Sequence, residues 1–450
     1  MAKTAEQEQV ILLFDTYGAD SKRLHKSFKL AKKSYPAVTI EENGFLPEDV
    51  QSVYGYFLGD WEHSADAPGR PCYFNEVKIP DYWQIDANNT MGVVYDLYHE
   101  RARIFYAEPT HKRQVKTVDW LDQSGKVRYS DHYNKYGAVY ARTSFDWQQN
   151  PIVKTYFTVD GKEKIVENFV TRDIILNEEK GPKIFNNKTE FVSYFFRLTG
   201  YSENRIFFNS LSTPFFVSCQ LQGEKNQDVL FWQEPVADEI PGNMQMILRG
   251  EASRTGMVYV QKRSAYQRLI QLGADPEKVK LKGFVYPFRQ KNQHRPAALI
   301  CTNSDQIEHC KEIVEALPQV KFHIAALTEM SPKLLAMEQY ENVHLYPGAK
   351  TEVIQALFSD CDIYLDINHA NEIVSALERA FLFNQVIFAF SNTLHNRDMT
   401  DVENIYSPQE ADRMVQDIRR ALENPEELDR RLHRQQAFAL AETVKNFLQM

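Results

Sequence analysis

The sequence has few glycines and none of the glycine patterns that bind phosphate. Its 450 residues include 18 glycines, about 4% against roughly 7% in an average protein, and no two of them are separated by a single residue. This excludes the Gly-x-Gly turns of dinucleotide-binding folds and P-loops. The His-Glu-x-x-His and Gly-x-Ser-x-Gly patterns of zinc peptidases and serine hydrolases are also missing.

Paired cysteines, long apolar runs and surplus positive charge are missing as well. The five cysteines never occur as Cys-x-x-Cys, which disfavours a disulfide framework or a structural zinc and fits the reducing cytoplasm. No run approaches the roughly 20 apolar residues of a membrane span, and Val10–Phe14 is too short for a signal-peptide core. The 52 Lys and Arg against 61 Asp and Glu give a net charge of −9, which argues against nucleic acid and direct lipid attachment. We expect a cytoplasmic protein that reaches the cytoplasmic face of the membrane only through a partner.

Apolar patterning predicts an α/β lobe that is interrupted by an antiparallel meander. Val10–Phe14 predicts a buried strand, followed by a surface helix at 21–34. From about residue 72 to 180, short segments rich in Tyr, Thr, Val and Trp alternate with turns, and Asp160-Gly161 predicts a hairpin. The lobe then resumes with a helix at 189–198 and with strands at 205–209, 215–218, 229–232 and 258–260.

After residue 295, strands and helices alternate regularly, which predicts a parallel sheet covered on both faces. The expected strands lie at 298–302, 321–326, 343–346, 362–365 and 386–390, and the expected helices at 307–317, 352–358 and 372–383. Further helices are expected after Ser331-Pro332, Ser407-Pro408 and Asn424-Pro425, which combine a capping side chain with proline. The predicted segments are 1–72 and 181–294 for the first lobe, 73–180 for the inserted meander and 295–450 for the second lobe.

Asp360-Cys361-Asp362 matches the Asp-x-Asp with which some glycosyltransferases hold a divalent metal. It falls at a helix-to-strand junction, where Asp360 would end a helix and Asp362 would start a strand. We therefore expect no metal site and no cofactor.

In a doubly wound sheet, the ligand lies beyond the carboxyl ends of the strands. Residues 366–372 occupy that place and resemble the segment of two-lobed retaining glycosyltransferases that carries two glutamates with seven residues between them. Glu378 precedes Val386 by eight positions, as the second glutamate does, and the first glutamate would stand at Ala370. Glu372 could replace it only if the loop shifted.

The contact to a donor diphosphate is also missing from the sequence. Active relatives place a basic residue just after the first strand of the second lobe, whereas residues 301–308 hold two acids and the first cation is Lys311. The degenerate donor-site positions are thus His369, Ala370, Asn371, Glu372 and Glu378. The plainer interpretation makes Glu372 a helix-terminal acid, His369 a loop residue with a local hydrogen bond, and Glu378 a remnant of ancestry.

The apolar opening Ile11-Leu-Leu-Phe-Asp15, the Tyr/Trp-rich meander, residues 365–374 and Val386-Ile-Phe-Ala-Phe390 together resemble a known family. This family is the accessory Sec system glycosylation chaperone, the stabilising B subunit of the transferase that modifies serine-rich repeat adhesins in Gram-positive bacteria. The resemblance implies a GT-B-like glycosyltransferase fold with the meander inserted in the first lobe. It implies a catalytic A subunit that transfers N-acetylglucosamine from its UDP form, an unfolded adhesin as acceptor, and two copies of each subunit.

The meander offers a surface for the acceptor or the partner, because a sheet edge can add an extended peptide and aromatic rings can pack on peptide and sugar. The candidates are Trp83, Trp120, Trp147, Tyr133, Tyr136 and Tyr140. Each could equally belong to the core of the sheet.

Two other functions stay open from the sequence. One is a self-sufficient retaining glycosyltransferase that uses Glu372 and Glu378, which would bind a UDP-sugar. The other is an adhesin-binding chaperone that leaves turnover by the partner unchanged.

Overall fold

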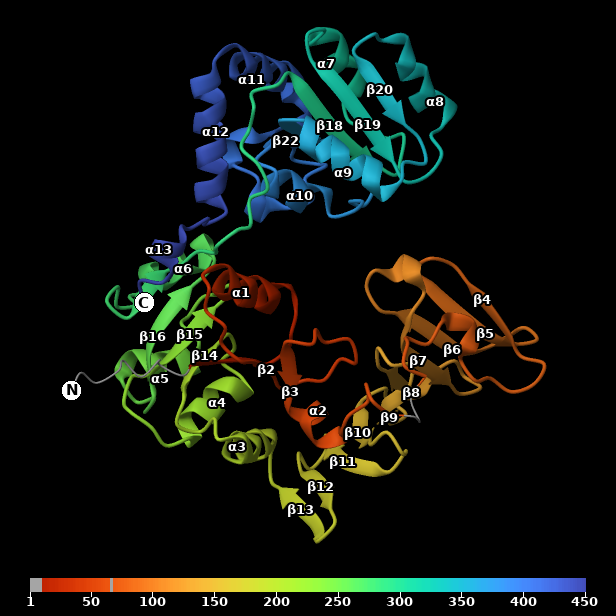
Figure 1. Ribbon diagram of the computed structural model, residues 1–450, viewed down its shortest axis with the longest axis vertical. Helices are drawn as coiled ribbons and strands as arrows, with labels where there is room; N and C mark the ends of the chain where they lie inside the picture. Colours follow the sequence, from red (N-terminus) through yellow and green to blue (C-terminus); the bar gives the residue numbers. More distant parts are fainter. Residues whose placement is uncertain (1–9, 65–67) are drawn as a thin grey trace. The chain divides into compact units, whose positions relative to one another are not determined.

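A computed structural model describes residues 10–64 and 68–450 (Figure 1). They form two compact units: the N-terminal unit comprises residues up to 29 and 33–281, and the C-terminal unit comprises residues 30–32 and 282–450. The structure contains two parallel sheets and one antiparallel sheet, which confirms the predicted α/β class with a meander. None of the helices in residues 10–64 and 68–450 is long and apolar enough to cross a membrane.

The N-terminal unit is built on a seven-stranded parallel sheet in the order β17-β16-β15-β14-β1-β2-β3. Its strands are β1 (Val10–Phe14), β2 (Ala37–Thr39), β3 (Val50–Ser52), β14 (Arg205–Phe208), β15 (Asp228–Trp232), β16 (Thr255–Val260) and β17 (Val279–Leu281). Its helices are α1 (Ala19–Leu30), α2 (Val53–Leu58), α3 (Lys188–Thr199), α4 (Thr213–Gln220), α5 (Gly242–Arg249) and α6 (Arg263–Gln271). All five residues of β1 are buried, as expected of a central strand that is covered on both faces.

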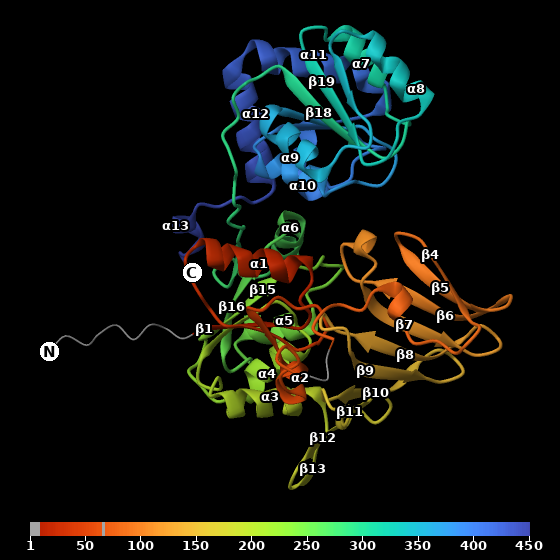
Figure 2. The same ribbon diagram turned by 45° about the vertical axis from the view of Figure 1, so that its right-hand side comes forward.

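Helices cover both faces of this sheet (Figure 2). Phe28 of α1 packs on one face, with its ring centroid 5.6 Å from that of Phe207 and 5.8 Å from that of Phe231. The other face carries Phe208 and Leu230, which share a core with α3, α4 and α5.

The antiparallel sheet is inserted between α2 and α3, and its ten strands follow one another in sequence order. They are β4 (Gln84–Ala87), β5 (Met91–Asp96), β6 (His99–Tyr106), β7 (Val115–Leu121), β8 (Val127–Tyr133), β9 (Val139–Phe145), β10 (Pro151–Phe157), β11 (Glu163–Asn168), β12 (Ile174–Glu178) and β13 (Gly181–Phe185). The predicted hairpin joins β10 and β11, and Gly161 takes the positive φ of 77° that its turn requires.

The two halves of the meander belong to different cores. Tyr156, Ile165 and Leu176 of the second half pack in one cluster with Tyr54 of α2 and Phe191 of α3. The first half, β4–β8, surrounds a separate cluster that includes residues 94, 104 and 118. The second half is therefore fixed to the parallel sheet, and the first half extends from it with a core of its own.

One predicted element of this unit is wrong. Residues 215–218 were expected to form a strand, but they lie in helix α4. Pro214 stands in the first turn of α4, a position that proline favours. A short apolar run such as Phe215-Phe216-Val217 suits a buried helix as well as a buried strand.

The C-terminal unit has a six-stranded parallel sheet in the order β20-β19-β18-β21-β22-β23. Its strands are β18 (Ala297–Thr302), β19 (Lys321–Ala326), β20 (Val343–Tyr346), β21 (Ile363–Asp366), β22 (Val386–Phe390) and β23 (Ile405–Tyr406). Its helices are α7 (Cys310–Ala316), α8 (Pro332–Leu335), α9 (Thr351–Asp360), α10 (Ala376–Leu382), α11 (Ala411–Glu423), α12 (Pro425–Phe438) and α13 (Val444–Phe447). Helices α7, α8, α11 and α12 share one core with the sheet, and α9 and α10 share another.

The predicted strands of this unit are confirmed to within one residue, and so are the caps at Ser331, Ser407 and Asn424. Two helices begin later than predicted. Helix α7 starts at Cys310 instead of 307, and α10 starts at Ala376 instead of 372. The residues missing from both helices lie where the ligand of such a sheet is expected.

Candidate donor edge and acceptor surface

The chain pairs with itself across the carboxyl ends of the adjacent strands β18 and β21. Ile307, after β18, forms an isolated antiparallel bridge with Asn368, after β21. The Glu308 amide donates to the Ile367 carbonyl at 2.8 Å, and the His369 amide donates to the Gln306 carbonyl at 3.0 Å. This pairing closes the edge at which a doubly wound sheet receives its ligand.

Side chains reinforce the closure. His369 Nε2 lies 2.6 Å from Glu308 Oε2, to which Asn392 also donates at 2.9 Å. Although burial opposes the effect, the hydrogen bonds from Asn392 and His369 lower the pKa of Glu308. His369 is thus a hydrogen-bonded loop histidine, but its partner is 61 residues away in the sequence.

A second histidine holds the loop from the other side. His395 Nδ1 lies 2.6 Å from Oδ1 of the buried Asp366, and Nε2 lies 2.7 Å from the Ala370 carbonyl. Both ring nitrogens face acceptors, so both carry a proton, and the Asp366 hydrogen bond raises the pKa of His395 to about 9. His395 is therefore a cation that fixes residues 366–370.

The remaining donor-site positions have local roles. Glu372 Oε1 accepts from the Leu377 amide at 2.6 Å, so this carboxylate caps the start of α10. Glu378 is exposed on that helix, and Asn371 is exposed in the loop. The Ala370 carbonyl, at the position where the sequence resemblance places the first glutamate, accepts from His395.

A pocket of about 270 Å³ remains between the loops that follow β18 and β19. It is lined by Asn303, Ser304, Asp305, Ala326, Thr328, Glu329, Met330, Ser331 and Leu334. All of these residues lie in the described chain, and none is Lys or Arg, whereas two are acids. A diphosphate entering here would meet negative charge without a compensating cation.

The Asp-x-Asp motif is structural. Asp360 ends α9, and the buried Asp362, just before β21, accepts from Arg295 Nε at 2.9 Å and Nη2 at 3.0 Å. Within residues 10–64 and 68–450, no three His, Cys, Asp or Glu side chains are placed to hold a metal ion.

The six candidate aromatic residues of the meander differ in exposure. Tyr133 and Tyr140 are buried in hydrophobic clusters, which favours the alternative that these two rings belong to the core of the sheet. Trp120 is partly buried, and its Nε1 donates to Asp131 at 2.9 Å. Trp83 is also partly buried, and the Arg101 guanidinium lies 5.7 Å from the centre of its ring. Trp147 is exposed, and the guanidinium of Arg128 lies over its ring.

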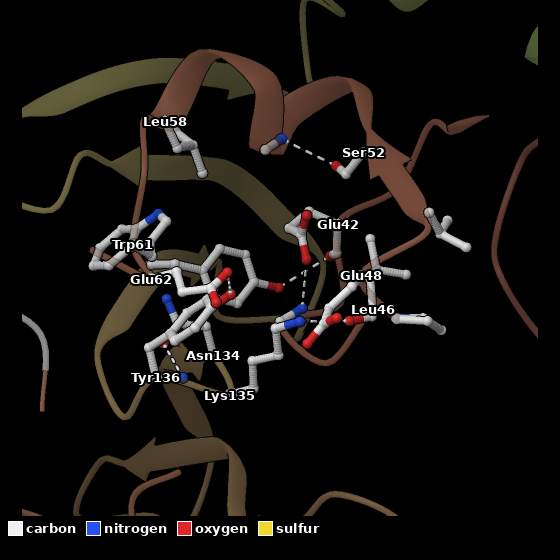
Figure 3. Close-up of a pocket in the computed structure, with 15 residues that line it drawn as sticks. Glu42, Leu46, Glu48, Ser52, Leu58, Trp61, Glu62, Asn134, Lys135 and Tyr136 are labelled. Atoms are coloured by element: carbon white, nitrogen blue, oxygen red, sulfur yellow. Dashed lines mark hydrogen bonds between the residues drawn. The ribbon is translucent and has the colours of Figure 1, made fainter. Parts of the chain in front are cut away.

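Tyr136 and Tyr140 line a second pocket, of about 250 Å³, where the meander meets the first lobe (Figure 3). Three carboxylates, Glu42, Glu48 and Glu62, lie around it together with Trp61. The Tyr136 hydroxyl donates to Glu62 at 3.4 Å, and the Tyr140 hydroxyl donates to the Glu42 carbonyl at 3.0 Å. The pocket therefore combines aromatic surface with hydrogen-bond acceptors.

Sequence reasoning missed His395, Glu308 and Trp61. His395 follows β22, at the same edge of the sheet as residues 366–372, so inspection of every strand end would have found it. Glu308 falls within the predicted helix 307–317, which gives no reason to place it at the ligand edge, and Trp61 lies outside the predicted meander.

The comparisons with known proteins cover most of the chain. Four family models match: the GtfB N-terminal domain at residues 11–57, the GtfB middle domain at 83–186, the GtfB third domain at 188–272 and the GftB/GlyA-F C-terminal domain at 298–435. The glycosyltransferase GlyB of Streptococcus pneumoniae is 35% identical over 120 residues, 27% of this chain and 29% of its own.

Full-length relatives agree with the family models. The stabilizing protein GtfB of the UDP-N-acetylglucosamine–peptide N-acetylglucosaminyltransferase of Streptococcus agalactiae is 44% identical, over 90% of this chain and 91% of its own. The protein of the same name from Streptococcus gordonii is 42% identical, over 92% of each chain.

Solved structures show the same relationship. A chain in the crystal structure of a GtfA/B complex bound to UDP and GlcNAc superposes with a TM-score of 0.88 and 40% identity, covering 97% of this chain and 98% of that one. Staphylococcus aureus TarM shares the fold at 12% identity and a TM-score of 0.50, over 98% of both chains. The resemblance noted in the sequence is thereby confirmed: this chain belongs to the GtfB family of glycosyltransferase-stabilizing proteins.

Proposed function

We propose that this chain is the non-catalytic subunit of a two-protein transferase that attaches N-acetylglucosamine to Ser and Thr of a serine-rich repeat adhesin. A separate A subunit would bind the UDP-sugar and carry out the transfer. The observation that carries this proposal is the closed donor edge, where the Ile307–Asn368 bridge and the Glu308–His369 contact occupy the ends of β18 and β21.

The charge of the same edge supports the loss of donor chemistry. A nucleotide diphosphate brings about two negative charges, and active sites offset such charge with preorganised cations or amide donors. Here Asp305 and Glu329 line the pocket. The nearby imidazolium, His395, is already committed to Asp366 and to the Ala370 carbonyl.

We further propose that the N-terminal unit binds the acceptor polypeptide. The exposed carboxylates of Glu48 and Glu62 can accept hydrogen bonds from Ser and Thr hydroxyls, while Trp61 and Tyr136 supply apolar surface to the peptide. The exposed Trp147 and the sheet edges of the meander offer further contacts.

The decisive experiment assays three samples with UDP-N-acetylglucosamine and a Ser/Thr-rich acceptor: this chain, the catalytic subunit, and both together. Transfer of labelled sugar should be absent with this chain alone and faster with both subunits than with the catalytic one. If this chain binds the acceptor but leaves the turnover rate of the catalytic subunit unchanged, the chain acts only as a chaperone.

Calorimetry separates the proposal from the remaining enzymatic alternative. Titration of the isolated chain with UDP and UDP-N-acetylglucosamine should give no saturable heat. A micromolar isotherm that is lost in Glu372→Gln, and kept in the exposed control Glu341→Gln, would instead support a self-sufficient retaining enzyme.

Acceptor binding has its own test. Trp61→Ala and Glu62→Gln should weaken binding of the acceptor peptide in fluorescence anisotropy, and Leu198→Ser, an exposed change on α3, should not. Equal binding by all variants would place the acceptor elsewhere. We also propose a cytoplasmic complex with two copies of each subunit, which light scattering of the co-purified proteins would measure.

A further inference from the structure

The β5–β6 hairpin ends in large apolar side chains that are almost completely exposed. Asp96 pairs with His99, so Leu97 and Tyr98 form a two-residue turn. Leu97 is 82% exposed and Tyr98 is 95% exposed. The register of the neighbouring pair, with Gln84 opposite Tyr95, brings Tyr82 to the same end of the sheet, where it is 97% exposed. We call Tyr82, Leu97 and Tyr98 the hairpin tip.

Turn geometry does not account for these side chains. Leu97 has a φ of +54° and Tyr82 a φ of +70°, a region that glycine and asparagine occupy at much lower cost. In a two-residue hairpin with positive φ at the first central position, that position normally holds glycine. The backbone would therefore be more stable with other residues, so the role of the tip has to be sought outside the fold of this chain.

Other turns at this end of the meander also expose apolar residues. Trp147, in the β9–β10 turn, is 69% exposed, and Val170, in the β11–β12 turn, is 72% exposed. The turns at the opposite end are more polar, with Asn88-Asn-Thr90 after β4 and Asp160-Gly-Lys162 after β10. The β7–β8 turn at the end of the tip is polar, Asp122-Gln-Ser-Gly125, so three of the four turns at this end carry exposed apolar side chains.

The charges beside the tip do not favour a lipid or a polyanion. Arg101 bonds to Asp96 at 2.8 Å and Arg103 bonds to Glu100 at 2.5 Å, so both arginines are offset by neighbours. Membrane-binding loops rely on basic residues around their apolar tips to attract anionic lipid. An apolar pocket on a folded protein matches the tip better.

The size of the tip fits the centre of a protein interface. Three side chains of this kind offer on the order of 500 Å² of surface, which is comparable to the largest apolar patch on a typical monomer. A standard interface buries about 800 Å² on each partner. The tip therefore supplies an anchor, and neighbouring residues would supply the rim.

We propose that the hairpin tip of Tyr82, Leu97 and Tyr98 inserts into an apolar pocket on the folded catalytic subunit and anchors the complex. This inference rests on the proposed function, because that function supplies the partner. Binding within a partner offsets the cost of the two left-handed residues, which are strained in the free chain.

The test uses substitutions that tolerate the positive φ angles of the tip and remove its large apolar side chains. They are Tyr82→Asn, and Leu97→Gly combined with Tyr98→Thr. We expect an unfolding midpoint that is unchanged or higher than that of the wild type. We also expect association with the separately purified catalytic subunit, measured by biolayer interferometry, to weaken about 30-fold or more, as for other interface anchors. The control Leu198→Ser removes an exposed leucine from α3 and should bind like the wild type.

Each outcome decides one question. If the wild type binds the catalytic subunit and the tip variants bind equally well, the inference is wrong while the proposed function stands. If the wild type does not bind, the proposed function fails. If the variants keep the partner but lose flotation with anionic phosphatidylserine vesicles, the tip is a membrane contact and the inference is overturned.

Discussion

Replacing Arg254 by Met should destabilise the N-terminal unit by about 3–5 kcal/mol, because it leaves a buried carboxylate without its partner. Arg254 is 1% exposed and Asp228 is fully buried, and Nε and Nη2 of the arginine reach the carboxylate at 2.9 and 3.1 Å. The same guanidinium also donates to the carbonyls of Ser202, Gln222 and Asn204. These acceptors would lose their donor as well.

The loss in Arg254→Met should depend on pH. Burial already raises the pKa of Asp228, although the hydrogen bond from Arg254 opposes the rise. Without Arg254 the pKa rises further, so Asp228 takes up a proton on folding. A carboxyl whose pKa is higher in the folded state contributes stability at low pH that is lost as the pH rises. The stability deficit of the variant should therefore be smaller at pH 5 than at pH 8.

Tryptophan fluorescence in urea measures this effect selectively, because Trp61, Trp83, Trp120, Trp147 and Trp232 all belong to the N-terminal unit. Combining Arg254→Met with Asp228→Asn should remove the pH dependence and cost less than the sum of the single changes. Arg249→Met, on the surface of α5, should cost less than about 0.5 kcal/mol. A deficit below 1 kcal/mol, or one that grows as the pH falls, would refute the reasoning.

Two further predictions concern the other contacts described above. Because Asp366 raises the pKa of His395 to about 9, the stability from this pair is complete below about pH 6.5 and is lost as the pH rises through 9. His395→Asn should abolish this loss, which amounts to at most about 3 kcal/mol; an unchanged pH profile of amide exchange in β21 and β22 would contradict it. Gly44 has a φ of +79°, and a Cβ there would lie 2.3 Å from the Tyr133 carbonyl oxygen. Gly44→Ala should thus cost at least about 2 kcal/mol by urea titration, whereas Gly59→Ala, also at positive φ but with no atom within 4 Å, should cost clearly less. Equal losses of stability in the two variants would mean that the positive φ, and not the close contact with the Tyr133 carbonyl, destabilises Gly44→Ala.

Local patterns predicted most of the secondary structure. Apolar runs such as Val10–Phe14 and Val386–Phe390 coincide with β1 and β22, because a run of buried residues between polar ones leaves little choice of conformation. Caps were similarly visible, since Ser407 and Glu410 form their capping box within four residues. The apolar run at 215–218 is too short for its length to distinguish a strand from a helix, and the predicted strand there is wrong.

The sequence by itself determined the two α/β units and the inserted meander, and it predicts that a glutamate and a cation are missing from the donor edge, because each of these depends on residue types and short spacings. Only the tertiary structure decided how that edge is filled. The Ile307–Asn368 bridge and the His395–Asp366 pair join segments that are 61 and 29 residues apart. The local sequence around these residues does not predict such long-range contacts. The exposure of Leu97 and Tyr98 likewise followed from strand register, since an apolar pair in a sequence normally indicates the core.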